Sequence, residues 1–184
     1  MDLGGKLLVA MPGLGDPRFD RSVILICAHS PEGAMGLIVN KPVSDMKFSA
    51  LLAQLNIAPG DGSRDIRVHF GGPVERARGF VLHSPDYAGG QATMEVPGGY
   101  GMTATRDVLE ALAQGAGPKR ALLALGYAGW GPGQLEAEIG RNDWLTAEAA
   151  DDLVFAPEDG GKWLGALRQM GIDPLMLSPM AGRA

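Results

Sequence analysis

The apolar segments of this chain are short, and turns rich in glycine and proline separate them. The sequence holds 28 glycines and 13 prolines, spread along its 184 residues. Because both residue types favour turns and end regular elements, we interpret them as many tight turns between short strands and helices. A chain of this length is long enough for one domain with a sizeable core, so residues 1–184 are expected to form a single domain.

Several apolar runs have the length and composition of β-strands. Residues 22–28 and 121–128 are almost continuously apolar, which is typical of strands inside a sheet. The turn at Pro31–Gly33 leads from the first run to residues 35–39, so these two strands are expected to pair antiparallel. Further strands or extended stretches are predicted at residues 6–11, 66–70, 80–83, 93–96 and from residue 144.

Helical periodicity appears between these strands. Apolar residues at Phe48, Leu51, Leu52 and Leu55 fall on one helical face, with Ser44 or Asp45 as the expected N-cap. Other helices are predicted after Thr105, around residues 135–139 and at residues 162–170. Strands and helices alternate irregularly, which indicates an α+β fold with a mixed, mostly antiparallel sheet flanked by helices.

Charge and cysteine content exclude several classes of protein. The net charge is −5, and lysine and arginine are scattered, whereas nucleic-acid-binding surfaces are usually basic. A single cysteine, Cys27, is consistent with a reducing compartment. The apolar run Leu7–Met11 is too short to cross a bilayer or to form a secretory signal. We therefore expect a cytoplasmic protein with no membrane partner and no direct nucleic-acid partner.

The candidates for chemistry are few. His29, His69 and His83 lie near the ends of predicted strands, but their spacing matches no metal-binding motif, so neither a metal nor a cofactor is predicted. Cys27 lies inside an apolar strand and is expected to be buried and unreactive. One alternative remains open: a hydrolase or transferase in which His29 or His83 is the general base and Asp20 or Glu138 orients it.

Two glycine-rich segments follow strands closely. Gly71–Val74 has Arg76 and Arg78 nearby and could hold an anion, but a tight turn explains its glycines and is the favoured interpretation. Gly129–Glu138 combines an indole with polar side chains on one helical face. With the loops at 18–21 and 40–41, this second segment gives the predicted ligand-binding residues: Arg18, Arg21, Asn40, Lys41, His83, Trp130, Gln134 and Glu138.

Several motifs in order resemble the YqgE/AlgH family of bacterial proteins, over nearly the whole chain. They are found at residues 8–12, 16–19, 21–23, 36–42, 71–74, 79–83, 125–130, 133–136, 142, 144–145 and 181–182. The resemblance implies a bent, barrel-like sheet. Members are often labelled transcriptional regulators, and the family brings no established catalytic residue. His69 does not match a family position. Six other residues do: His29, Asn40, His83, Trp130, Gln134 and Glu138.

The function predicted from these observations is binding without catalysis. The protein is expected to sense a small ligand or a partner protein and to regulate indirectly, with some of its glycine-shaped loops converging on one cleft. Direct DNA binding is a weaker alternative, because the sequence has no helix-turn-helix pair and no basic recognition helix.

Overall fold

The computed structural model describes residues 2–87 and 90–177, and in this part of the chain nine strands form one curled sheet. The strands follow the order β6-β7-β5-β8-β3-β2-β1-β9, and β4 pairs with β8 in parallel. Their bounds are β1 Lys6–Ala10, β2 Val23–Ser30, β3 Gly33–Ile38, β4 Val68–Phe70, β5 Val74–His83, β6 Thr93–Val96, β7 Tyr100–Thr103, β8 Ala121–Trp130 and β9 Trp144–Glu148. All other pairings are antiparallel, so the predicted α+β class with a mixed, half-barrel sheet is confirmed.

Strand β8 joins the two halves of the sheet. Residues 121–125 of β8 pair with β5 and β4, whereas Tyr127 pairs with Val74 of β5 and the last three residues pair with β3. Between them lies Gly126, whose φ of 75° is accessible to glycine at little cost. A Cβ at this position would lie 2.4 Å from the carbonyl oxygen of Gly72. The Gly71–Val74 segment therefore packs directly on the bend of β8, which explains its glycines by close backbone contact.

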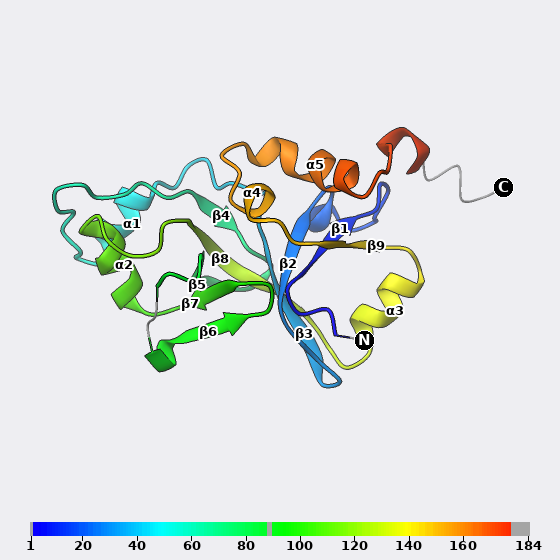
Figure 1. The fold of residues 1–184 in the computed structure, drawn as a ribbon, viewed down its shortest axis with the longest axis horizontal. Coiled ribbons are helices and arrows are strands. Elements are labelled where there is room, and N and C mark those ends of the chain that lie inside the picture. The colour runs from blue at the N-terminus through cyan, green and yellow to red at the C-terminus, as the bar shows by residue number, and fades with distance from the viewer. Residues whose placement is uncertain (1, 88–89, 178–184) are drawn as a thin grey trace.

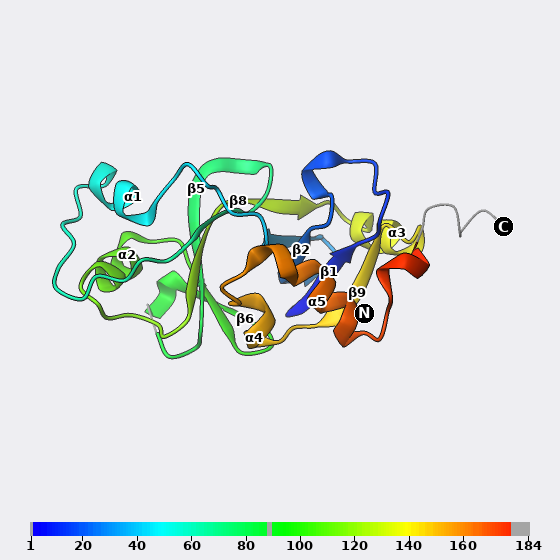
Figure 2. The ribbon, with the colours of Figure 1, turned by 90° about the horizontal axis from the view of Figure 1, so that it is seen from above.

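Helices cover one long side and both ends of the sheet (Figures 1 and 2). α4 and α5 lie over the middle of the sheet, α1 and α2 lie at one end, and α3 lies at the other. The helix bounds are α1 Phe48–Gln54, α2 Arg106–Ala113, α3 Gln134–Gly140, α4 Asp151–Val154 and α5 Lys162–Gln169. Short 3-10 helices occupy η1 Pro17–Phe19, η2 Gly90–Ala92, η3 Asp159–Gly161 and η4 Pro174–Leu177.

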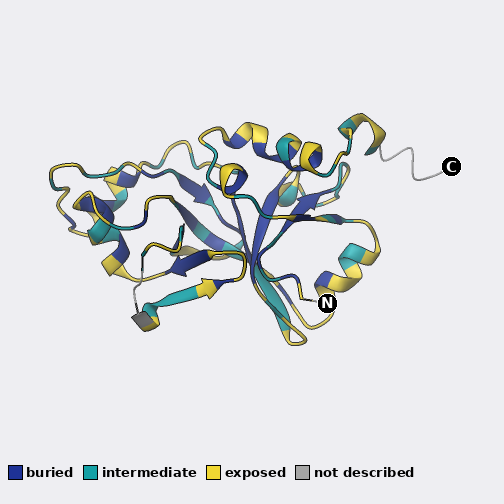
Figure 3. Ribbon diagram, in the orientation of Figure 1, coloured by how far each residue is buried: buried dark blue, intermediate teal, exposed yellow. Residues whose placement is uncertain are grey.

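The central strands are buried on both faces, as the dark ribbon of β1 and β2 in Figure 3 shows. Leu7 and Leu25 belong to the core cluster beneath α5, whereas Leu8 and Ile24 belong to a second cluster that includes Trp130. Because successive side chains of a strand point to opposite faces, two covered faces require the continuous apolar runs seen in the sequence.

Most predicted elements are present, and the errors concern short or irregular ones. The antiparallel pairing of β2 and β3 is confirmed. The N-cap predicted for α1 is wrong, since the residue there is Lys47. Strand β7 was not predicted, and the charged residues 75–78 form part of β5. Cys27 is buried as expected, and its burial raises the pKa of the thiol to about 12.

Candidate functional site

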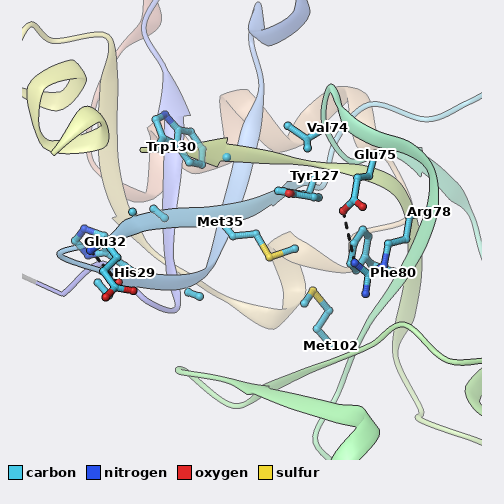
Figure 4. Close-up of a pocket in the computed structure, with 15 residues that line it drawn as sticks. His29, Glu32, Met35, Val74, Glu75, Arg78, Phe80, Met102, Tyr127 and Trp130 are labelled. Carbon is cyan, nitrogen blue, oxygen red and sulfur yellow. Dashed lines mark hydrogen bonds and ion pairs between the residues drawn. The ribbon is translucent and has the colours of Figure 1, made fainter. Parts of the chain in front are cut away.

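An open groove with a volume of about 730 Å³ lies where β3, β5, β7 and β8 meet. Its centre is apolar, formed by Met35, Phe80, Met102 and Tyr127, and Trp130 lies at one end (Figure 4). Its edges are polar and are formed by His29, Ser30, Glu32, Glu75 and Arg78. Small-molecule sites in proteins commonly have this volume and this combination of apolar walls with a few polar groups.

A bulge in β5 forms one wall of the groove. Val74 pairs with Tyr127 and Gly79 pairs with Leu125, so five steps along β5 correspond to two along β8. The extra residues leave the ladder, beginning with Glu75 at a φ of 48°. Consequently Arg78 stands beside the groove, 3.5 Å from the Glu75 carboxylate and with its guanidinium 4.9 Å from the Phe80 ring centroid.

The floor of the groove is open because Gly129 has no side chain. Gly129 pairs with Met35 of β3 and is exposed to solvent. A Cβ built there would make only ordinary contact with the Tyr127 ring, at 3.4 Å. Met35 and Met102 reach into the space from different strands (Figure 4). Their flexible thioether side chains allow the walls to adapt to ligands of different shape.

His29 lies on the groove wall, but both of its ring nitrogens have partners. The Leu3 backbone N–H donates to Nδ1 at 3.0 Å, so the ring proton is on Nε2 and is donated to Glu136 Oε1 at 2.5 Å. The carboxylate beside His29 is therefore Glu136, and not Asp20 or Glu138 as proposed for the enzyme alternative. In this arrangement neither nitrogen is available to accept a proton from a substrate.

His83 lies inside the protein, away from the groove. Its Nδ1–H donates to the Ser84 carbonyl at 2.8 Å, and Nε2 accepts from the Thr103 hydroxyl at 2.8 Å. Burial lowers the pKa of His83, although the Ser84 carbonyl and Asp86 oppose this shift. The side chain is fully buried, which favours the neutral imidazole and a structural role.

Three of the predicted ligand residues meet in one corner, where they bond to the backbone. Asn40 accepts from the Val23 N–H and donates to the Arg21 carbonyl, both at 2.9 Å. Lys41 donates to the Asp20 carbonyl at 2.7 Å. Arg21, at a φ of 53°, places its guanidinium 5.3 Å from the Trp163 ring centroid. These contacts tie the 17–21 loop to the end of β3 and leave it outside the groove lining.

Arg18 belongs to the same 17–21 loop, but its side chain has a different partner. It forms a hydrogen-bonded ion pair with Asp16 at 2.6 Å, and this pairing lowers the pKa of the Asp16 carboxyl against the opposing effect of burial.

The other predicted residues surround α3. The Trp130 ring packs edge-on against Trp144, with centroids 6.3 Å apart. Gln134 Oε1 accepts from the Gly131 N–H at 2.9 Å, and Glu138 Oε1 accepts from the Trp144 indole at 3.4 Å. Of the eight predicted ligand residues, Trp130 is the member of the groove lining. The other seven predicted ligand residues therefore lie outside the groove lining.

The groove residues that sequence reasoning missed come from strands far apart in the chain. Tyr127 and Gly129 carried a signal, because they are two residues apart on a strand and share a face. Nothing in the sequence indicates that Met35 and Met102 would face the same space. Their proximity depends on the sheet order, which places β3 and β7 on opposite sides of β5 and β8.

A second polar cluster lies at the start of α5, where His69, Asp159 and Lys162 are buried and Arg67 is 40% exposed. Asp159 Oδ1 accepts from His69 Nε2 at 3.0 Å and from Lys162 Nζ at 2.8 Å, and Arg67 bonds Oδ2 at 2.8 Å. Lys162 is almost fully buried and also donates to the carbonyls of Val39 and Val154. We call Arg67, His69, Asp159 and Lys162 the buried ionic cluster.

The pKa shifts in the buried ionic cluster follow from these contacts. Burial raises the pKa of Asp159, but its hydrogen bonds with His69 and Lys162 outweigh this and hold the pKa below its usual value. Burial lowers the pKa of Lys162, and Asp159 opposes that shift. The cluster therefore favours a carboxylate that is held by cations and is inaccessible to a substrate.

In residues 2–87 and 90–177, no group of three or more histidine, cysteine, aspartate or glutamate side chains is arranged to hold a metal ion. The helices of the same ranges include none with the length and apolar character needed to span a bilayer.

Comparison with known proteins gives consistent matches over the full length. A UPF0301 protein of Cereibacter sphaeroides is 68% identical over 184 residues, covering 100% of both chains. A UPF0301 protein of Ruegeria pomeroyi is 61% identical over 186 residues, again covering 100% of both.

The solved structures agree on the fold. The solution structure of the AlgH protein of Pseudomonas aeruginosa has a TM-score of 0.80 and 39% identity, covering 100% of this chain and 97% of that one. A crystal structure of a Corynebacterium diphtheriae protein has a TM-score of 0.76 at 24% identity, with 96% and 91% covered, and supports the fold alone. The family model described as AlgH-like matches residues 7–175. The resemblance seen in the sequence motifs is therefore confirmed, and the chain belongs to the AlgH-like family.

Proposed function

We propose that this protein is a binding module whose β3–β5–β7–β8 groove takes a small organic ligand with an apolar body. The observation that carries this proposal is the groove itself, with about 730 Å³ of space above an apolar floor and with charged groups confined to its edge. An apolar body would cover the exposed parts of Met35 and Tyr127, and burial of apolar surface favours association by about 25 cal/mol per Å².

The edge of the groove would orient the ligand. Arg78 and Glu75 are separated by 3.5 Å and are both more than half exposed, so their pairing is weak. Each can exchange this partner for a ligand group of opposite charge at little cost. A ligand with one charged or hydrogen-bonding end would lie with that end toward Arg78 or Glu75.

Binding is favoured over catalysis by the state of the groove's histidine. His29 donates to Glu136 and accepts from Leu3, so catalysis by this residue would require breaking a hydrogen bond to the backbone. The remaining lining offers hydrogen-bonding groups and thioethers, which suit recognition.

Gly129 provides a direct test. In Gly129→Phe the new ring would fill the floor of the groove, whereas Gly129→Ala adds only a methyl group in ordinary contact with Tyr127. Ligands found by screening a metabolite library with NMR should shift the amide signals of Met35, Tyr127 and Gly129 in the native protein. We expect Gly129→Phe to weaken their binding at least about tenfold, a loss of roughly 1.4 kcal/mol.

Gly140→Phe is the matched control, because a Cβ at Gly140 meets no atom within 4 Å and the residue lies at the far end of α3. It should bind as the native protein does. If Gly129→Phe and Gly140→Phe bound every ligand with equal affinity, the groove would not be the binding site. Absence of any shift in the groove residues across the library would do the same.

A further inference from the structure

A second pocket, with a volume of about 400 Å³, lies between α4, the start of β8 and the segment before β4. Four cationic side chains line it: Arg64, Arg67, Lys119 and Arg120. Two carboxylates lie among them, Asp65 and Asp152. This excess of cations is local, because the chain as a whole carries a net charge of −5.

Two of the guanidinium groups are held in place by backbone carbonyls. Arg64 donates to the carbonyls of Pro118 and Lys119, and Arg67 donates to those of Ala156 and Pro157. Carbonyl oxygens fix the position of a guanidinium without neutralising its charge. A guanidinium has five N–H donors, so both arginines keep donors for a further acceptor.

Carboxylates offset part of the positive charge of the pocket, and one of them, Asp86, lies outside the lining beside Lys119. Asp159 bonds Arg67 at 2.8 Å, but the same carboxylate also bonds Lys162 at 2.8 Å. The single negative charge of Asp159 is therefore shared between Arg67 and Lys162. The partner of Arg120 is Asp152, at 3.2 Å, and the Asp152 side chain is 93% exposed. Exposed pairs of this kind contribute little and are readily exchanged.

We propose that this pocket binds the phosphate group of a small molecule. Arginine and lysine side chains from two separate segments surround one space, and such an arrangement can contact several oxygens of a doubly charged anion at once. Phe155 and Pro157 provide an apolar wall for the body of the molecule. This site is independent of the groove and does not share its lining residues.

The test removes two exposed cations and leaves the carbonyl-bound arginines intact. Binding of inorganic phosphate and of a nucleoside monophosphate to the full chain would be measured by isothermal titration calorimetry, with succinate as a dicarboxylate of similar charge. We expect saturable binding of both phosphate compounds, and at least about a tenfold loss of affinity in Lys119→Gln/Arg120→Gln.

Lys47→Gln/Arg141→Gln is the matched control, because it changes the net charge equally at exposed positions outside the pocket. It should keep the native affinity. Circular dichroism would verify that both double variants are folded. The proposal is overturned if no phosphate compound binds, if both double variants lose affinity equally, or if succinate binds as tightly as phosphate. Gly129→Phe should bind phosphate normally, so failure of the groove proposal and failure of this one are distinguishable.

Discussion

The groove and the buried ionic cluster place charged side chains in opposite environments. Glu75 and Arg78 at the groove edge are both more than half exposed and lie 3.5 Å apart. Asp159 and Lys162 are nearly fully buried and lie 2.8 Å apart, and Lys162 has two further carbonyl partners. Charges removed from water must be paired and hydrogen-bonded, whereas exposed charges can stay loosely partnered. The comparison indicates that the buried ionic cluster supports the fold and that the groove edge is free to bind.

The largest expected effect comes from breaking the buried pair. Lys162→Met leaves Asp159 without one of its cations and leaves the Val39 and Val154 carbonyls without a donor. We expect a loss of about 3–5 kcal/mol in the free energy of unfolding, measured by urea denaturation. Adding Asp159→Asn should recover about 1 kcal/mol or more, because the buried carboxylate that has lost its Lys162 partner is gone. A loss below about 1 kcal/mol in the single variant would show that Lys162 is not essential to the cluster.

A smaller change in the free energy of unfolding is expected when the pH is lowered. The pKa of Asp159 is lower in the folded protein than its value of 3.8 in the unfolded chain. Such a group stabilises the fold above the unfolded pKa, and this contribution is lost as the pH falls below 3.8 toward the folded pKa. The stability difference between the native protein and Asp159→Asn should therefore be constant from pH 6 to 5 and should narrow below about pH 3.8. A difference that is unchanged at pH 3 would contradict this assignment.

The smallest effect on stability is expected at the groove edge. Arg78→Gln removes a weak ion pair and the contact with the Phe80 ring. We expect a change of about 1 kcal/mol or less in the free energy of unfolding, from the same urea measurement. Its effect should instead appear in the affinity for anionic groove ligands. A stability loss as large as that of Lys162→Met would mean that the two regions do not differ as described.

Sequence reasoning succeeded where a local pattern decides the outcome. The apolar run of β2, the turn before β3 and the periodicity of α5 each depend on neighbouring residues, and the corresponding elements formed. The family motifs were sufficient to identify the fold. The error at the start of α1 has a different cause: the N-cap is Lys47, whose side chain makes no capping hydrogen bond, so a search for a capping side chain does not locate it.

The site could not be predicted in the same way. The sequence predicts Asn40, Gln134 and Glu138 as ligand residues because they are polar and lie in or beside loops, yet each has a hydrogen-bond partner in the protein itself. A polar side chain near a turn satisfies the backbone as readily as it binds a ligand, and sequence alone does not distinguish the two. The sequence predicts Lys162 only as the first residue of a helix. In the part of the chain that the structure describes, it is the lysine or arginine with the least exposed surface.

The sequence by itself determined the short strands, the irregular mixture with helices, the buried cysteine and the family. These follow from local apolar patterns and turn residues, whose physical effects act over a few positions. Only the tertiary structure decided that Met35, Phe80, Met102 and Tyr127 share one groove and that His69 meets Asp159 and Lys162 at the start of α5. The groove depends on the sheet order, and the cluster depends on the contacts of Asp159 with β4 and with Lys162, so in both cases packing brings distant segments together.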